Sequence, residues 1–311
     1  MPAIDLPWPV RSTPAMHGTT TPIATPIATT AAPSDPEIDP ERLATLRATA
    51  LNLRRHMLAQ ARGKGQGYLG QGLGIADFLA VLYFDEFQAA DLDWQRQDRK
   101  RFYLSTGHNS IALWAAFAER GLISQASLPS YGADGSPLEM STMQGRVPGV
   151  EMTGGSLGHG LGIAAGAALG YRLDGHRSAI HVEISDGELQ EGSTWEGASI
   201  GAAFGLDNLV CWIDCNGIQA DGPLVVPVEP VAGRFAAFGW DTAEIDGNDL
   251  RQLLGAFAWT HARNGKPKAV VLRTRPGCGI RRVQQRESAH FVRVEPDEWD
   301  DLARELEAEN A

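Results

Sequence analysis

Two polar residues, Asp186 and Asn216, carry the clearest chemical signal in this chain of 311 residues. Asp186 follows a strand pattern at Ile180–Ile184, and Asn216 follows an apolar run at Leu209–Ile213. If both runs are parallel strands, the two polar side chains lie at the carboxyl edge of one sheet, where open α/β folds bind ligands. A carboxylate and an amide oxygen suit Mg²⁺ or Ca²⁺, and Mg²⁺ usually completes its shell with phosphate and water. The pattern therefore predicts a metal ion that holds a diphosphate.

The segment between the two runs has the features of an anion site. Gly187 follows Asp186 and lets the backbone approach a ligand closely. A helix expected to begin near Ser193 would point its free N–H groups at the anion. Upstream, the glycines and alanines of Gly154–Gly170 also allow the backbone to come close to a ligand or to another helix.

Strand and helix signals alternate along the rest of the chain. Gly63–Gly74 is expected to form a glycine-rich turn and residues 275–295 a loop. Further strands are expected at Arg101–Leu104 and Lys268–Thr274, and helices after the N-cap signal at Asp39, at Ala76–Phe87, near Asn109–Arg120, near Leu250–Arg263 and at about Pro296–Leu306. This alternation predicts an α/β fold with a doubly wound, mostly parallel sheet and helices on both faces.

Composition narrows the class of protein. The hydrophobic fraction of 43% is typical of a globular protein, and the net charge of −11 argues against a nucleic-acid partner. No apolar run has the length of a transmembrane helix, and the N-terminus lacks the pattern of a secretory signal. Cys211, Cys215 and Cys278 have no metal-binding spacing and fit a reducing compartment. We therefore expect a cytoplasmic protein without a membrane partner.

The N-terminal segment differs from the rest of the chain. Residues 1–38 are rich in Thr, Pro and Ala, and closely spaced prolines block helix formation. We expect a disordered arm at 1–38 and one folded domain at 39–311.

One glycine motif points to a different ligand. Gly65, Gly67 and Gly70 match the G-x-G-x-x-G of dinucleotide-binding proteins. That motif must follow a strand and open a helix, whereas here it follows a long helical pattern. We therefore expect no dinucleotide site at this position.

The block at 182–222 closely resembles the thiamine-diphosphate motif of transketolases, in which an asparagine follows a Gly-Asp-Gly turn by about thirty residues. The string Asp-Gly-Glu-Leu-Gln-Glu-Gly at 186–192 is typical of the transketolase branch. The likeness extends from about residue 42 to the C-terminus. Other segments similar to the family are Asp77–Tyr83, Ser105–His108, Pro148–Glu151, Thr153–Leu161, Phe238–Trp240, Glu244–Asp249 and the histidine at 290.

The resemblance implies a thiamine-diphosphate-binding fold with thiamine diphosphate and Mg²⁺ (or Ca²⁺) as cofactors. It assigns the metal to Asp186, Asn216 and the backbone carbonyl of Ile218. It assigns catalytic roles to His108 and His290, which would lie over the diphosphate and the thiazolium ring. The residues it places at the cofactor are Gly155, Leu157, Gly187, Glu191 and Asn216, and Glu191 would also join a glutamate network across a subunit interface.

The resemblance also implies a partner. The chain matches only the diphosphate-binding domain, so it resembles the N-terminal subunit of a split transketolase. A C-terminal transketolase-like subunit would carry the pyrimidine-binding domain and the glutamate that activates the cofactor. We expect an α2β2 assembly, active only when both subunits are present.

Two departures from the family concern the substrate. Transketolases have substrate-facing histidines where this chain has Tyr68 and Ser141. Ser185 replaces the first glycine of the metal turn, and Phe291 stands after His290 where glycine is usual. Because sites that pair a substrate hydroxyl discriminate strongly, these changes predict a different substrate.

Three functions stay open at this point. The first is transfer of a two-carbon ketol or acyl unit by a transketolase-like enzyme. The second is decarboxylating acyl transfer from a 2-oxo acid such as pyruvate, as in dehydrogenase E1 components or deoxyxylulose-phosphate synthase, with Arg146, Arg281 or Arg282 meeting the carboxylate. The third is a non-catalytic regulatory subunit that keeps the fold.

Overall fold

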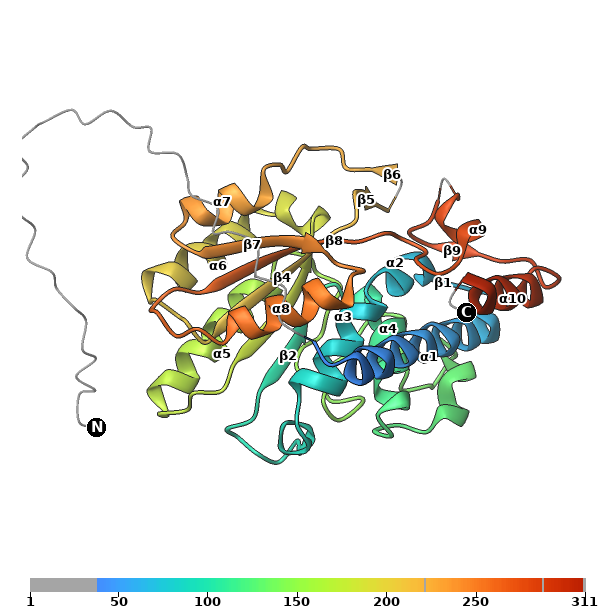
Figure 1. Ribbon diagram of the computed structural model, residues 1–311, viewed down its shortest axis with the longest axis horizontal. Coiled ribbons are helices and arrows are strands. Elements are labelled where there is room, and N and C mark those ends of the chain that lie inside the picture. The colour runs from blue at the N-terminus through green and yellow to red at the C-terminus, as the bar shows by residue number, and fades with distance from the viewer. Residues whose placement is uncertain (1–37, 221, 287, 310–311) are drawn as a thin grey trace, which may run out of the picture.

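A parallel sheet of five strands forms the centre of the protein. The computed structural model describes residues 38–220, 222–286 and 288–309, so the expected arm at 1–38 lies outside the described residues except for Ile38. The strands follow the order β2 (Arg101–Leu104), β3 (Ile180–Ser185), β4 (Leu209–Cys215), β8 (Lys268–Arg273) and β7 (Asp241–Asp246), and Figure 1 labels four of them, β2, β4, β8 and β7. The predicted doubly wound α/β fold is confirmed.

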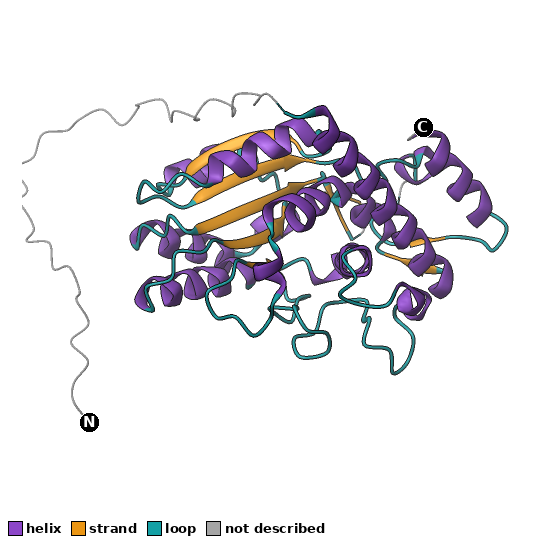
Figure 2. Cartoon of the chain, turned by 60° about the horizontal axis from the view of Figure 1, so that its bottom comes forward, coloured by secondary structure: helices purple, strands orange, loops and turns teal. Residues whose placement is uncertain are grey.

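Helices cover both faces of this sheet (Figure 2). One face packs against α1 (Pro40–Lys64), α3 (Ala76–Val81), α4 (Ser110–Glu119) and α8 (Leu250–Thr260), and the other against α5 (Gly160–Leu173), α6 (Gly192–Ala203) and α7 (Val231–Ala237). Successive strand residues alternate between the two faces. In β4, Val210 and Trp212 therefore join the first core, whereas Cys211 and Ile213 join the second.

The glycine-rich segment after α1 is more regular than the sequence suggested. Instead of a turn, Gly63–Gly74 contains the last residues of α1, the short strand β1 (Gln66–Gly67) and the helix α2 (Leu69–Gly74). The expected loop at 275–295 likewise contains α9 (Arg281–Gln284) and β9 (Val292–Arg293). β1 and β9 pair antiparallel, outside the main sheet, so tertiary pairing orders two segments with weak local signals.

Other boundaries shift by a few residues. The helix expected over Ala76–Phe87 divides into α3 and a single π-turn at Leu82–Glu86. The last helix, α10 (Trp299–Glu309), begins and ends three residues later than expected. Strand β7 was not predicted, and a two-stranded ribbon, β5 (Ile218–Gln219) with β6 (Gly222–Pro223), follows β4. Among the described residues, no helix is long and apolar enough to cross a membrane.

The carboxyl ends of the strands gather the candidate residues. β2 runs into Ser105–His108, β3 into Asp186 and Gly187, and β4 into Asn216 and Gly217. β3 and β4 pair in parallel with Ser185 opposite Asp214, so Asp186 and Asn216 leave the same edge of the sheet. The expected placement of Asp186 and Asn216 at one carboxyl edge is therefore confirmed.

Candidate active site

A cavity of about 490 Å³ opens at this carboxyl edge. It brings together eight residues named from the sequence as site residues, from segments far apart in the chain. Its lining consists of Tyr68, Gln71, His108, Gly155, Leu157, Ser185, Gly187, Gln190, Glu191, Ile218, Gln219, Ala220, His290 and Phe291. Pockets of this size hold small molecules and cofactors.

The turns after β3 and β4 are tied to each other by Asp186. Its Oδ1 accepts a hydrogen bond from the N–H of Gly187 at 2.8 Å, and its Oδ2 accepts one from the N–H of Gly217 at 2.7 Å. Asn216 donates from Nδ2 to Asp214 at 2.8 Å and accepts at Oδ1 from the N–H of Ile218 at 3.0 Å. Both side chains are therefore held rigidly beside the cavity wall formed by Gly187 and Ile218.

The electrostatics of this turn fit a cation. Asp186 is buried, and its burial together with the nearby Asp214 raises its pKa to about 7. A buried carboxylate beside a second carboxylate is stabilised in its charged form by a positive ion. Within the described ranges, no group of three or more His, Cys, Asp or Glu side chains is placed to hold a metal ion, so Asp186 and the amide oxygen of Asn216 are the candidate side-chain donors at this turn. That donor set suits Mg²⁺ bound together with phosphate oxygens.

The opposite side of the turn suits an anion. Glu191 is the N-cap residue of α6 and lines the cavity, so the first N–H groups of this helix lie at the cavity wall. Gly155 has φ +107°, and a Cβ there would come within 3.0 Å of the Ser141 hydroxyl. A glycine at 155 is therefore required by the positive φ and by the nearby Ser141.

His108, His290 and Tyr68 form an aromatic group on the cavity wall. The ring centroids of the two histidines are 5.1 Å apart, and that of Tyr68 is 5.2 Å from His108 and 5.4 Å from His290. Burial, with a smaller effect of His290, lowers the pKa of His108 to about 3. His108 is therefore a neutral imidazole at pH 7, and its Nε2 is buried with no hydrogen-bond partner among the described residues.

Two residues expected at the substrate do not line the cavity. Arg146 is exposed and pairs with Glu139 at 3.1 Å, because the loop that carries it turns toward solvent. Ser141 lies behind the wall, packed against the backbone of Gly107 and Gly155. The Ser141 side chain is therefore not part of the cavity lining.

The other arginines considered for a substrate carboxylate also lie elsewhere. Arg281 is within 3.5 Å of Glu309, and Arg282 is within 2.9 Å of Asp301. Both ion pairs join α9 to α10, so these arginines stabilise the C-terminal packing and are absent from the cavity lining.

One buried carboxylate that the sequence did not single out links three segments of the site. Glu188 is completely buried, and its Oε1 accepts hydrogen bonds from the Ser105 hydroxyl and, at 2.8 Å, from the N–H of Gly158. It therefore joins the metal turn to the segment that carries His108 and to the loop that carries Gly155. Burial raises the pKa of Glu188 to about 7.

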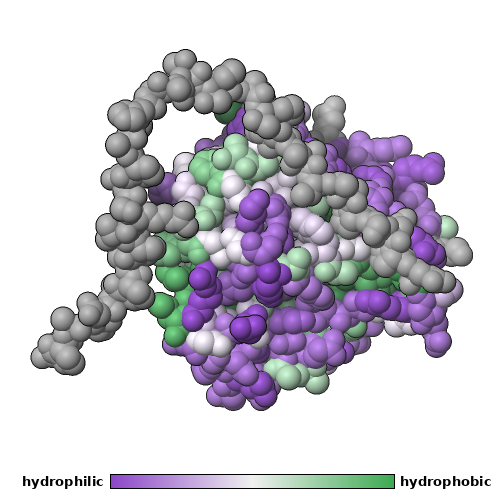
Figure 3. Space-filling model, turned by 60° about the vertical axis from the view of Figure 1, so that its left-hand side comes forward, coloured by the Kyte–Doolittle hydropathy of each residue, from purple (hydrophilic) through white to green (hydrophobic). Residues whose placement is uncertain are grey.

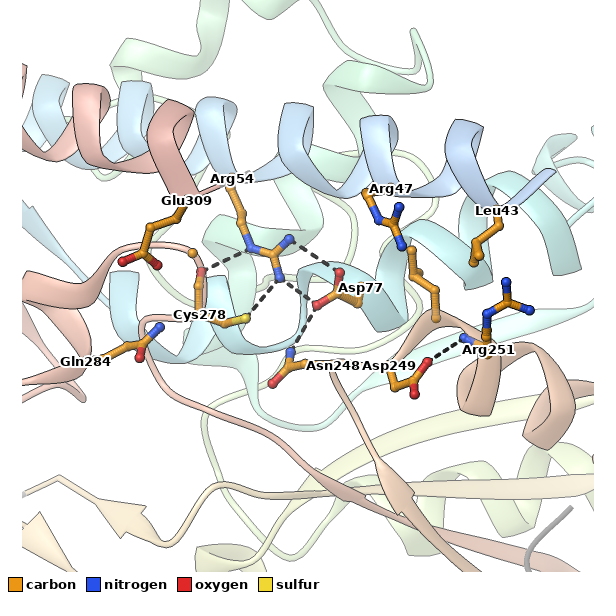
Figure 4. Close-up of a pocket in the computed structure, with 12 residues that line it drawn as sticks. Leu43, Arg47, Arg54, Asp77, Asn248, Asp249, Arg251, Cys278, Gln284 and Glu309 are labelled. Carbon is orange, nitrogen blue, oxygen red and sulfur yellow. Dashed lines mark hydrogen bonds and ion pairs between the residues drawn. The ribbon is translucent and has the colours of Figure 1, made fainter. Parts of the chain in front are cut away.

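A larger cavity of about 800 Å³ lies beneath α1 (Figure 4). At its centre, Arg54 and Asp77 form a buried ion pair of 2.5 Å. Asn248 donates to Asp77 at 3.0 Å, and Arg54 donates to the carbonyl of Cys278 at 3.1 Å. These charges satisfy one another and join α1 to α3 and to the loops at 248 and 278. The larger cavity shares no lining residue with the cavity at the carboxyl edge.

Comparison with known proteins agrees with this geometry. Residues 47–310 match the family described as "Transketolase, thiamine diphosphate binding domain". A transketolase family protein of Sinorhizobium fredii is 46% identical over 265 residues, which cover 83% of this chain and 94% of that protein. A 6-deoxy-6-sulfo-D-fructose transketolase subunit of a Clostridium species is 33% identical over 263 residues, which cover 84% of this chain and 96% of that subunit.

Solved structures give the same assignment. The transketolase of Leishmania mexicana superposes with a TM-score of 0.74 at 27% identity, covering 84% of this chain. The match spans only 41% of that enzyme, so the chain corresponds to one part of a full-length transketolase. On the family match, the close relatives and the shared fold, the chain belongs to the transketolase family and contains its thiamine diphosphate binding domain.

Proposed function

We propose that this chain is the diphosphate-binding subunit of a two-component, thiamine-diphosphate-dependent transketolase that transfers a two-carbon ketol unit. The observation that carries the proposal is the cavity of about 490 Å³ at the carboxyl edge, which joins the metal turn, the glycine loop at 155 and the two histidines. Bound thiamine diphosphate supplies a nucleophilic carbon that adds to a substrate carbonyl and stabilises the negative charge that follows. A non-catalytic subunit would have no need of this combination.

Each wall of the cavity has its own proposed role. Asp186, Asn216 and the carbonyl of Ile218 hold Mg²⁺, which in turn holds the diphosphate. Gly155, Leu157 and Gly187 shape the backbone around the cofactor, and the N-terminus of α6 faces its negative charge. Glu191 lies exposed at the cavity wall, where it can meet a partner subunit.

The two histidines act on the substrate oxygen. His108 is neutral, so it can donate or accept a hydrogen bond at the reacting carbonyl without a cost for burying charge. His290 lies 5.1 Å from it between ring centroids, so the two imidazoles flank the same space. Proton transfer to and from the substrate oxygen is the role we assign to this pair.

The lining favours a ketose over a 2-oxo acid. Among the described residues that line the cavity there is no lysine or arginine, and the three arginines considered for a carboxylate all pair elsewhere. A substrate carboxylate buried here would therefore lack a counter-charge from this chain. The relative from Clostridium is named for a modified ketose, and Tyr68 gives the pocket a shape different from that of a histidine. We propose an uncommon ketose as the donor.

A donor comparison tests this assignment. In the complex reconstituted with its partner subunit, kcat/KM would be measured for xylulose 5-phosphate, 6-deoxy-6-sulfo-D-fructose and pyruvate. We expect pyruvate to be the poorest of the three, and xylulose 5-phosphate not to be the best. If xylulose 5-phosphate wins by about tenfold or more, equivalent to about 1.4 kcal/mol, the chain belongs to a conventional transketolase. If pyruvate wins, the 2-oxo acid alternative is correct.

An apolar surface supports the proposed α2β2 assembly. α5 and α6 pack side by side and expose Ile163, Leu173, Ile200 and Phe204, with Leu173 69% exposed. Figure 3 shows apolar areas on the side of the molecule that carries α5, α6 and α7. Exposed apolar patches of this kind mark interaction sites, and we assign this one to a second copy of the chain.

Replacing Ile200 by aspartate is expected to disrupt that self-association. A charge placed in an apolar interface loses its hydration without a partner, so the dissociation constant should rise about a hundredfold. The mass of the purified chain, measured by light scattering over a dilution series, gives this constant. Val225→Asp is the matched control, because Val225 is an exposed apolar residue on the loop before α7. A wild-type chain that is monomeric at all concentrations, or equal effects of the two substitutions, would remove this assignment.

The cytoplasm is the proposed location. Cys211, Cys215 and Cys278 are all free thiols. Free thiols fit a reducing compartment, which is the basis of this proposal.

A further inference from the structure

Gln71 is a buried amide on the cavity wall to which neither the sequence nor the family match gives a role. It is 2% exposed and lines the cavity at the carboxyl edge. Its Oε1 is buried and has no hydrogen-bond partner among the described residues. An unpaired buried polar group costs free energy. An unpaired buried oxygen next to a cavity therefore indicates that a bound ligand donates the missing hydrogen bond.

The helix that carries Gln71 is fixed in place by close backbone contacts. A Cβ at Gly70 would lie 2.0 Å from the carbonyl oxygen of Ala289, and one at Gly72 would lie 2.7 Å from a methyl group of Ile111. The N–H of Gly277 also donates to the carbonyl of Gly70 at 2.6 Å. The amide of Gln71 is therefore presented from a rigid support, as a selective polar contact requires.

The position of Gln71 points to the substrate rather than to the diphosphate. It follows Tyr68 by three residues, about one helical turn, and α2 packs against the segment that carries His290. The metal turn at Gly187 and Ile218 comes from the ends of β3 and β4 instead. Gln71 thus belongs to the wall of Tyr68, His290 and Phe291, next to the two histidines that we assign to the reacting carbonyl.

The chemistry of the lining defines the group that Gln71 would meet. The two other amides of the lining satisfy each other, because Gln190 donates to Gln219 at 2.8 Å. With no lysine or arginine in this lining, Gln71 offers an uncharged acceptor that does not titrate. The partner that such an oxygen selects is a hydroxyl group, the functional group that distinguishes a ketose from a simple 2-oxo acid.

We propose that Gln71 is a specificity-determining residue whose Oε1 accepts a hydrogen bond from a hydroxyl on the carbon chain of the donor. The inference rests on the proposed transketolase function. It adds the functional group of the donor, a hydroxyl, that the site recognises. It makes recognition of the donor depend on a hydroxyl beyond the transferred two-carbon unit.

The test compares two donors that deliver the same two-carbon unit. Xylulose 5-phosphate carries further hydroxyls beyond that unit, whereas hydroxypyruvate, a 2-oxo acid that this cavity is expected to use less well than a ketose, carries none. Both would be assayed with the reconstituted wild-type complex and with Gln71→Leu, which keeps the side-chain size and removes the acceptor. We expect kcat/KM for xylulose 5-phosphate to fall about tenfold to a hundredfold and that for hydroxypyruvate to change less than about twofold.

Calorimetric titration of each complex with thiamine diphosphate and Mg²⁺ supplies a second readout, and equal affinity is expected. An equal fall with both donors, an unchanged donor ratio, or a weaker cofactor affinity would overturn the role of Gln71. A wild-type complex that uses hydroxypyruvate but no ketose overturns it as well. If the wild-type complex uses no donor while binding the cofactor, the proposed transketolase function itself fails, and the inference fails with it.

Discussion

Replacing Asp186 by alanine is expected to abolish Mg²⁺-dependent binding of thiamine diphosphate. The substitution removes the carboxylate that we propose as a metal ligand, and also the acceptor for the N–H groups of Gly187 and Gly217, which set the shape of the turn. Loss of a charged contact of this kind costs a few kcal/mol, so the cofactor affinity should fall by about a hundredfold or more. Calorimetry of the assembled complex at fixed Mg²⁺ measures the change directly.

Asp207→Ala is the matched control for this experiment. Asp207 also accepts a backbone hydrogen bond, from Gly265 at 3.0 Å, but it lies before β4 at the opposite edge of the sheet. Its loss should leave cofactor affinity within about twofold. Unchanged affinity in the Asp186 variant would refute the metal assignment, and an equal loss in both variants would indicate general destabilisation.

The main sheet could be anticipated because its strands carry strong local signals. Strands β3 and β4 are both buried between two helical layers: β4 is apolar on both faces up to Ile213, whereas β3 has apolar residues at 180, 182 and 184 with His181 and Glu183 between them. Parallel pairing then forces their carboxyl ends to one edge, so Asp186 and Asn216 could be placed together before their contacts were known. Edge strand β7 escaped prediction because its six residues include only two apolar ones, Ala243 and Ile245, with the exposed Glu244 between them.

The site residues that the sequence did not identify, Glu188 and Gln71, are polar side chains that become buried only through tertiary packing. Glu188 and Glu191 stand three positions apart in the same polar string, yet the first is completely buried and the second is exposed. Glu188 is buried because Ser105 and Gly158 pack against it and donate hydrogen bonds to its carboxylate, and the local sequence does not show this difference. The sequence did not identify Gln71 either, because a glutamine between glycines indicates a turn. In the structure, that segment is a helix because it packs against Ala289 and because β9 pairs with β1 just before it.

Arg146 was predicted to lie in the site, but it lies outside the cavity lining. An arginine near a glycine loop is a reasonable candidate for a substrate carboxylate on sequence grounds. Its long side chain instead reaches Glu139, seven residues earlier (146 − 139 = 7), in an exposed pair. Charged side chains on irregular loops have no periodicity that fixes their direction, so the sequence could not decide which way this one points.

The purified chain is expected to lack transferase activity until a partner subunit is added. Among the described residues, the cavity lining contains one carboxylate, Glu191, which is exposed. The family resemblance places the glutamate that activates the cofactor on a domain that this chain does not match. Since a missing general acid–base group alone lowers rates by about 10²–10⁴, turnover by the isolated chain should be at least about a hundredfold below that of the complex.

The measurement is a steady-state assay of the chain with thiamine diphosphate, Mg²⁺ and a ketose donor, before and after titration with the partner subunit. Activity should rise in proportion to the partner added and level off at equal concentrations of the two subunits. A parallel preparation carrying Asp186→Ala separates the chain's own turnover from that of a contaminating host enzyme. Activity of the isolated wild-type chain that matches the complex and disappears in this variant would show that the cavity is complete without a partner.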